Sequence, residues 1–169
     1  MDITIEKLQL PDARNLFEFE MVNREYFEEM VPSRGDEFYN YDTFMERLGS
    51  LLKEQAQGLS SFFLIKNNDG LILGRINIAD IDEFKSLGYI GYRVGKDHIG
   101  KGLAQLALKL LADKMRNEGF ERLLAKTTSN NIASQRILEK NGFIKRSTGD
   151  EEIMMNGQSV NFVHFIRFL

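Results

Sequence analysis

The stretch YIGYRVGKDHIGKGLAQLALKLL, residues 89–111, decides the fold of this chain. It begins with β-branched and aromatic residues, which predict a strand, and continues into a turn that contains Gly95, Gly100 and Gly102. Apolar residues then recur at helical spacing from Leu103 onward. A glycine-rich turn between a strand and a helix gathers free backbone N–H groups at the positive end of the helix dipole. We therefore expect the turn to bind phosphate.

Several kinds of phosphate site are compatible with this turn. Residues 95–102 nearly match a nucleotide-triphosphate loop, but Gly102 stands where that loop needs a magnesium-binding Ser or Thr. A dinucleotide fingerprint would place a third glycine at Gln105. A pyrophosphate cradle of the coenzyme A kind needs only the amides of Ile99 to Ala104, close backbone approach at the glycines, and charge from Lys101. The glycines could also serve only a tight turn.

The rest of the chain predicts one domain, residues 1–169, with the order β-α-α-β-β-β-α-β-α-β-β and an α+β (mixed α/β) fold. We expect one helix from Pro11 to about Phe27, and a second helix opened by a capping box of Thr43 and Glu46. The turn NNDG and the dipeptide Asn156-Gly157 predict two hairpins. Asn130 or Asn131 is expected to cap a short helix.

Composition excludes several classes of function. The net charge of −3 argues against non-specific nucleic-acid binding. The chain has no Cys and two His, which excludes thiol chemistry and disfavours a histidine-rich metal site. It opens without a signal-peptide pattern and contains no apolar run of membrane-spanning length. These features favour a cytoplasmic enzyme or binding module with no nucleic-acid or membrane partner, as a monomer or homodimer.

Two motifs, in order and on suitable elements, resemble the GNAT superfamily of N-acetyltransferases. The first is DHIGKG, residues 97–102, in which Asp97 stands where the superfamily usually has Arg or Gln. The second is NIASQRILEKNGF, residues 131–143. The resemblance covers about residues 60–168 well and the first 60 loosely. It implies a GNAT-like acyl-CoA N-acyltransferase fold, with a central, twisted, mostly antiparallel sheet flanked by helices.

The resemblance also implies the chemistry: acetyl-CoA as co-substrate, no metal, and direct attack of a primary amine on the thioester in a ternary complex. A bulge at Gly91–Tyr92 would leave the Tyr92 amide free as an oxyanion donor, and strands parting after Val94 and Thr127 would hold the pantetheine arm. The residues expected to bind acetyl-CoA are Val94, Ile99, Gly100, Lys101, Gly102, Leu103, Ala104 and Asn131.

Details of the sequence are similar to the Rim type, which acetylates protein N-termini. Many relatives use a Tyr in the second motif as general acid, but the matching residue is Leu138, so Ser134 becomes the candidate acid. Rim-type relatives use a Glu base whose position matches Ile153, next to Glu151 and Glu152. Either glutamate could serve as the base, and Glu152 is our candidate; the alternative is that both are solvated edge charges.

The acceptor is expected to be a protein N-terminal α-amine, because an α-amine, with a pKa of about 8, needs less help from a base than a lysine with a pKa of about 10.4. A small amine, a polyamine or a non-catalytic acyl-CoA-binding module are the alternatives. The acidic loop of residues 80–84 could attract a cationic acceptor, with a plain solvated loop as the alternative.

Overall fold

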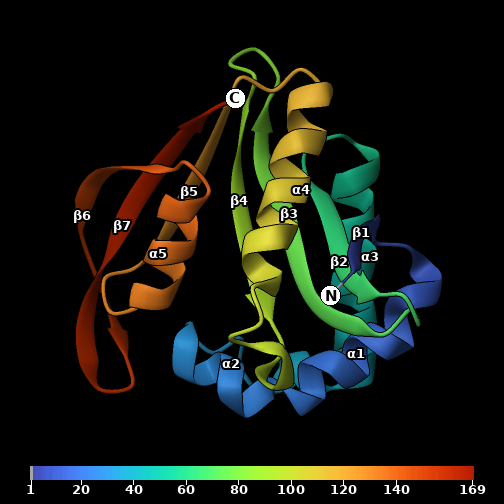
Figure 1. Ribbon diagram of the computed structural model, residues 1–169. Coiled ribbons are helices and arrows are strands. Elements are labelled where there is room, and N and C mark those ends of the chain that lie inside the picture. The colour runs from blue at the N-terminus through green and yellow to red at the C-terminus, as the bar shows by residue number, and fades with distance from the viewer. Residues whose placement is uncertain (1) are drawn as a thin grey trace.

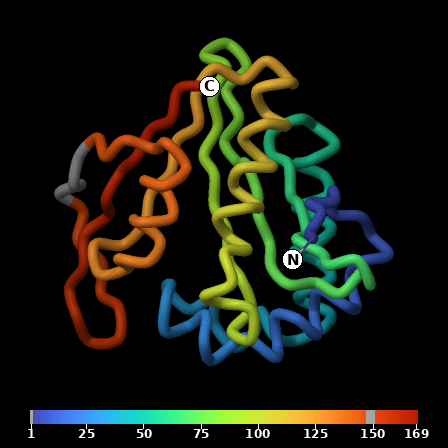
Figure 2. Tube along the Cα trace, in the orientation of Figure 1, coloured from blue at the N-terminus to red at the C-terminus, as the bar shows by residue number. Residues whose placement is uncertain are grey.

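The computed structural model describes residues 2–169, with side chains for all of them except residues 147–150 (Figure 2). A seven-stranded sheet in the order β1-β2-β3-β4-β5-β7-β6 forms the centre. Its strands are β1 (Ile3–Lys7), β2 (Ser61–Asn67), β3 (Ile72–Asp82), β4 (Leu87–Val94), β5 (Arg122–Thr128), β6 (Ile144–Met155) and β7 (Gln158–Phe168). Only the β4–β5 pair is parallel. The predicted α+β fold with a mostly antiparallel sheet is confirmed.

Helices cover both faces of the sheet (Figure 1). They are α1 (Ala13–Val22), α2 (Arg24–Met30), α3 (Tyr41–Ala56), α4 (Leu103–Asn117) and α5 (Ile132–Lys140). One buried cluster joins α4 and α5 to one face of the sheet, and a second joins α1, α2 and α3 to the other face of β2 and β3. The alternation along β2 produces the two clusters, because Phe63 and Ile65 face α4 whereas Phe62 and Leu64 face α1 and α3.

The prediction of one helix from Pro11 to Phe27 is wrong, because the helix is interrupted at Asn23. The Asn23 side chain donates to the Phe19 carbonyl at 2.9 Å and accepts from the Lys96 amide at 2.8 Å. This side chain therefore competes with the helical pattern and ties α1 to the turn after β4.

The predicted capping box of Thr43 and Glu46 is also wrong. The helix begins earlier, at Tyr41, and the side chain of Asn40 caps it by accepting from the amides of Asp42 and Thr43. Asn40 satisfies the free amides of the first turn, which leaves Thr43 inside the helix. The other predicted strands and both hairpins are confirmed, and Asn131 caps α5.

Candidate functional site

The central feature of the site is a cleft of about 660 Å³ where β4 and β5 separate. The two strands pair only from Leu87↔Arg122 to Ile90↔Ala125 and then diverge, as Figure 1 shows. The sequence predicts separation after Val94 and Thr127, but the strands separate earlier, after Ile90 and Ala125. Hydrogen bonds hold the first halves of the two strands together. Beyond them the second halves have no pairing with each other, and the cleft lies between them.

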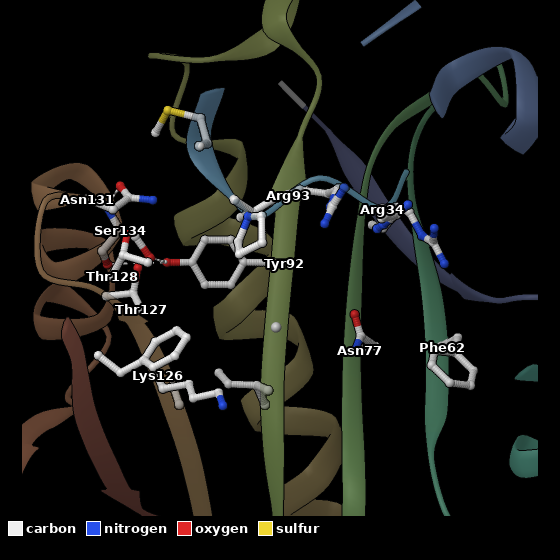
Figure 3. A pocket seen from close by; sticks show the side chains of 18 of the residues that line it. Arg34, Phe62, Asn77, Tyr92, Arg93, Lys126, Thr127, Thr128, Asn131 and Ser134 are labelled. Carbon is white, nitrogen blue, oxygen red and sulfur yellow. Dashed lines mark hydrogen bonds between the residues drawn. The ribbon is translucent and has the colours of Figure 1, made fainter. Parts of the chain in front are cut away.

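The cleft has two chemically different sides. Alternate residues of β4 face opposite ways: Tyr92 packs against the α4 cluster, whereas Arg93 lies over the Phe27 ring of α2 at 4.8 Å. Ser134 and Asn131 of α5 line the cleft with Tyr92. One side therefore presents hydroxyl and amide groups, and the other presents cationic groups (Figure 3).

The glycine turn leads into the first turn of α4 and provides a row of free amides. Gly100 and Gly102 have φ values of 74° and 75°, which favour glycine, and a Cβ at either one would meet nothing within 4 Å. The first helical bond runs from the Leu106 amide to the Gly102 carbonyl. Within the described part of the chain, none of the six amides from residue 100 to residue 105 has a hydrogen-bond partner. Such a row suits a diphosphate, which supplies several acceptor oxygens.

The predicted diphosphate-binding residues lie along this turn and helix start. The Ile99 amide contacts only the Lys96 carbonyl, at 3.5 Å. Leu103 and Ala104 are the first residues of α4; the Leu103 side chain is buried in the core, so only its backbone is available. The Lys101 ammonium donates to the Asp97 carbonyl at 3.0 Å and lies at the exposed rim.

The predicted bulge at Gly91–Tyr92 is wrong, because the pairing with β3 is regular there, with Asn77 opposite Gly91 and Ile76 opposite Tyr92. A free amide arises in another way. The Gly95 amide donates to Leu73 of β3, and successive amides of a strand point to opposite sides. The amides of Tyr92 and Val94 are therefore directed toward the gap that β5 leaves open.

The side chain of Tyr92 has a role that the sequence did not suggest. Its hydroxyl lies 3.0 Å from Ser134 Oγ and 3.3 Å from the Ser134 carbonyl oxygen, and its single proton can be donated to either one. Burial raises the pKa of Tyr92 to about 12, against a smaller lowering by the Ser134 hydrogen bond. The phenol therefore stays protonated at neutral pH and can hold the Ser134 hydroxyl in place. Figure 3 shows the two side chains pointing at each other across the cleft.

Asn131 and Leu138 frame Ser134 on α5. The Asn131 side chain accepts from the Ser134 amide at 3.1 Å, which fixes the start of the helix and leaves its NH₂ group available in the cleft. Leu138 is 1% exposed and contributes an apolar wall. Helix α5 thus places the Ser134 hydroxyl in the cleft.

The structure does not bring Glu152 into the cleft. Glu152 lies on β6 opposite Asn161, is exposed, and accepts from Ser159 Oγ at 3.1 Å. Its neighbour Ile153 pairs with Val160 and also does not line the cleft. The role of Glu152 as base stays a prediction.

An ion cluster in the wall of the cleft was not predicted from the sequence. The Glu20 carboxylate has no exposed surface, and its oxygens lie 2.7 Å from Arg75, 3.1 Å from Arg34 and 3.8 Å from Arg93. Burial raises the pKa of Glu20, but attraction to the three arginines outweighs burial and lowers the pKa below its usual value. A charged residue on the apolar face of α1 was the available signal.

The acidic loop does not lie beside the cleft. Residues 80–84 end the β3–β4 hairpin, at the end where β4 is still paired with β5 (Figure 1). Asp82 there contacts Lys85 at 3.7 Å. The expectation that this loop attracts a cationic acceptor is therefore wrong.

As for metals, the described residues contain no group of three or more His, Asp or Glu placed to bind an ion. Nor does their helical part include a segment of the length and apolarity needed to span a membrane.

Comparison with known proteins identifies the family. Residues 2–144 match the family model described as an acetyltransferase (GNAT) domain. The chain belongs to the GNAT acetyltransferase family. It is accordingly an acetyl-CoA-dependent N-acetyltransferase, and the family resemblance read from the two motifs is confirmed.

Individual relatives extend along almost the whole chain. The chain is 26% identical over 158 residues to "Probable N-acetyltransferase YjcK" of Bacillus subtilis, covering 92% of this chain and 87% of YjcK. The ribosomal-protein-S5-alanine acetyltransferase of Vibrio fischeri superposes with a TM-score of 0.90 at 22% identity, over 99% of this chain and 93% of that one. The RimL ribosomal L7/L12 α-N-protein acetyltransferase, solved with coenzyme A, gives 0.91 at 15% identity, over 99% and 94%.

The co-substrate of GNAT enzymes can be compared with the free amides of residues 100–105. Acetyl-CoA carries a diphosphate, and the turn offers unpartnered N–H groups with open space above both glycines. The residues present therefore fit the co-substrate. Of the alternatives for this turn, the coenzyme A cradle is the one that the family supports.

Proposed function

We propose that the chain transfers the acetyl group of acetyl-CoA to the α-amine of a protein N-terminus. One observation favours this acceptor: among the described residues that line the cleft, none is Asp or Glu. An α-amine with a pKa of about 8 is partly neutral at physiological pH, whereas a lysine or polyamine amine is almost wholly protonated. A site with no carboxylate at hand suits the amine that needs the least deprotonation. The acceptors named for the Vibrio fischeri enzyme and RimL, both ribosomal proteins, agree with this choice.

The residues of the chain would act on a ternary complex. Acetyl-CoA supplies the acetyl group as a thioester. The amides of residues 100–105 would hold the diphosphate, and the Val94 amide, at the open edge of β4, would bind the pantetheine arm. The Tyr92 amide would face the thioester oxygen and stabilise the negative charge that develops there. Aligning the two substrates is worth about 7–11 kcal/mol in favourable cases.

Ser134 would act as the general acid. As the new C–N bond forms and the C–S bond breaks, the sulfur takes a proton from Ser134 Oγ. The Tyr92 hydroxyl, 3.0 Å away, would donate to Ser134 Oγ and orient it. The amine loses a proton in the same sequence, and the alkoxide left on Ser134 takes a proton back from water, so that the protons balance over one turnover. Glu152 does not line the cleft, so it would not touch the amine. As the base, it would receive the proton of the amine through water.

A thiol-release assay with an acceptor panel tests the proposal. The panel contains peptides with free N-termini, the same peptides with blocked N-termini and one internal lysine, spermidine, and an amino sugar. We expect thiol release with the free N-termini, confirmed by a mass increase of one acetyl group on the α-amine. Faster turnover of spermidine or the amino sugar would contradict the acceptor assignment. Calorimetric binding of coenzyme A without release by any acceptor would instead favour a binding module.

Glu152→Gln tests the base. If Glu152 receives the proton, the pH profile of kcat/KM should move to higher pH in the variant, while the affinity for coenzyme A is unchanged. A profile that superposes on the wild-type profile would remove Glu152 from the mechanism. The nearby Glu151→Gln, an exposed glutamate on the same strand, is the matched control.

A further inference from the structure

Cationic side chains surround the acceptor side of the cleft. Five of them line it, one each from the loop after α2, α3, β3, β4 and β5: Arg34, Arg47, Arg75, Arg93 and Lys126. The chain as a whole carries a net charge of −3, so this concentration of positive charge is local and does not follow from composition. Figure 3 shows Arg34, Arg93 and Lys126 on separate elements around the same cleft.

The five cations lie on the side of the sheet away from the diphosphate cradle. On β3 and β4, Arg75 and Arg93 alternate with Ile76 and Tyr92, which pack toward α4. On β5, Lys126 alternates with Ala125, which belongs to the same α4 cluster. The diphosphate cradle is at the start of α4. The phosphates of a bound coenzyme A would therefore lie on the other side of the sheet, and these cations would be available to the second substrate.

Their charge is only partly compensated inside the protein. Glu20 is the one carboxylate within 4 Å of the three arginines in the described structure. The remaining two cations contact aromatic rings, Arg47 at 5.3 Å from the centre of Phe38 and Lys126 at 4.6 Å from that of Phe162. A ring face attracts a cation but does not neutralise it. Neither has a carboxylate within 4 Å among the described residues.

An unbalanced cluster of this kind favours an anionic guest. The three arginines around Glu20 are half-buried, whereas Arg47 and Lys126 are exposed at the mouth of the cleft. Like charges held close together repel one another, most strongly where they are half-buried, and a negative ligand relieves that repulsion. Burial, together with Arg34 and Arg75, lowers the pKa of Arg93 to about 10, which is the expected effect of such crowding. A polyamine or a lysine-rich peptide would add to the repulsion.

We infer that the acceptor amine is carried by an anionic molecule, with carboxylate or phosphate oxygens that reach Arg47 and Lys126 while the amine lies at the β4–β5 gap. This inference rests on the proposed acetyl transfer and narrows its substrate class. The source that agrees with a protein N-terminus is an acidic peptide, whose first residue is followed by Asp or Glu. A small amine that carries a carboxylate or phosphate is the other source of the same chemistry.

Charge-matched acceptors test the inference. Three peptides share length and first residue and continue with Asp-Glu, Asn-Gln or Lys-Lys; free aspartate and phosphoethanolamine form the small-molecule arm. We expect kcat/KM for the acidic peptide to exceed that for its amide counterpart at least tenfold, with the basic peptide lowest. This advantage should shrink between about 0.1 M and about 1 M salt, as the screening length falls from about 10 Å to about 3 Å.

Variants assign the effect to this surface. Arg47→Gln with Lys126→Gln should remove most of the advantage in kcat/KM of the acidic peptide over the amide peptide. Neither side chain contacts Glu20, so circular dichroism should show the same melting curve for the double variant. Lys53→Gln, an exposed cation on α3 that does not line the cleft, is the control and should change nothing.

The outcomes separate this inference from the proposed function. Equal rates for acidic and amide acceptors, or a preference for the basic peptide or spermidine, would overturn the anionic acceptor even where acetyl transfer occurs. Turnover of a small anionic amine but of no peptide would keep the anionic acceptor and refute the protein N-terminus. If nothing on the panel releases thiol, binding is measured instead, by displacement of an anionic fluorophore from the coenzyme A-loaded protein. Displacement by the acidic peptide that is lost at high salt would support the inference. Failure of the acidic peptide to displace the fluorophore would overturn it.

Discussion

Replacing Glu20 by Gln should destabilise the protein substantially, because it removes the carboxylate that holds three arginines together. At an effective dielectric constant of about 20, unit charges 2.7 Å apart attract by about 6 kcal/mol, and the buried carboxylate loses several kcal/mol of hydration in return. Removing one partner from a buried ion pair typically costs 3–5 kcal/mol. Gln keeps the shape and can still accept from Arg75, so we expect about 3 kcal/mol.

Urea unfolding followed by far-UV circular dichroism measures this loss, since the chain has no Trp for fluorescence. A loss of about 3 kcal/mol corresponds to roughly 6–12 °C in the melting temperature for a chain of this size. Glu18→Gln, an exposed glutamate of the same helix, is the control and should cost less than about 0.5 kcal/mol. A loss below about 1 kcal/mol for Glu20→Gln would refute the view that the carboxylate neutralises the cluster.

The difference between wild type and Glu20→Gln should also depend on pH. The pKa of Glu20 is lowered in the folded state, below the ordinary value of 4.5. A lowered carboxyl pKa contributes stability that is fully present above the unfolded value and is lost as pH falls through the folded value. The gap should therefore be constant at neutral pH and narrow as the pH falls below about 4.5. A gap that widens in acid would contradict the assignment.

Three further perturbations test other parts of the site. Ser134→Ala should lower kcat roughly 100-fold with little change in the KM for acetyl-CoA, and Tyr92→Phe should lower kcat less. If the phenol acts through Ser134, the double variant should be no slower than Ser134→Ala alone; additive losses would contradict that coupling. Gly102→Ala should weaken coenzyme A binding about tenfold by calorimetry, because a left-handed backbone costs an L-residue about 1–2 kcal/mol and relief of this strain would move the amides of the cradle. Gly119→Ala, with φ of 92° at the far end of α4, is the control: it should lose similar stability but keep its affinity for coenzyme A. Gly74→Ala should destabilise more than either in thermal melts, because its Cβ would lie 2.6 Å from the Arg93 carbonyl oxygen; an unchanged melting temperature would show that β3 and β4 can move apart.

The elements around the site were largely predictable because each carries a local signal. The β-branched and aromatic residues from Tyr89 predicted the strand that is β4, and the glycine turn predicted the free amides at the start of α4. The misplaced helix boundaries have a different cause. Asn23 and Asn40 act through side-chain hydrogen bonds to particular amides and carbonyls, and the sequence offered other plausible caps nearby.

The chemistry of the cleft was less predictable because it depends on residues far apart in the chain. Glu20 meets Arg75 and Arg93 only once α1 lies across β3 and β4, and Tyr92 meets Ser134 only across the open gap. A sequence pattern shows that a polar residue falls on a buried position but not which partner it will have. The parting of the strands also depends on how β5 is held by β7, where pairing continues to Thr128↔Phe162 after β4 has separated.

Helix α1 links the two halves of the site through residues one turn apart. Glu20 holds arginines of β3 and β4 on the acceptor side, and Asn23 accepts from the Lys96 amide in the turn that precedes the diphosphate cradle. Gly95, next to Lys96, approaches Phe19 and Asn23 so closely that an added Cβ would come within 3.1 Å of the Phe19 ring and 3.3 Å of Asn23. The backbone of the turn is therefore packed closely against the end of α1, which is also tied to it by the Asn23 hydrogen bond. The amine side and the thioester side therefore share one rigid support, which is what alignment of two substrates at a single gap requires.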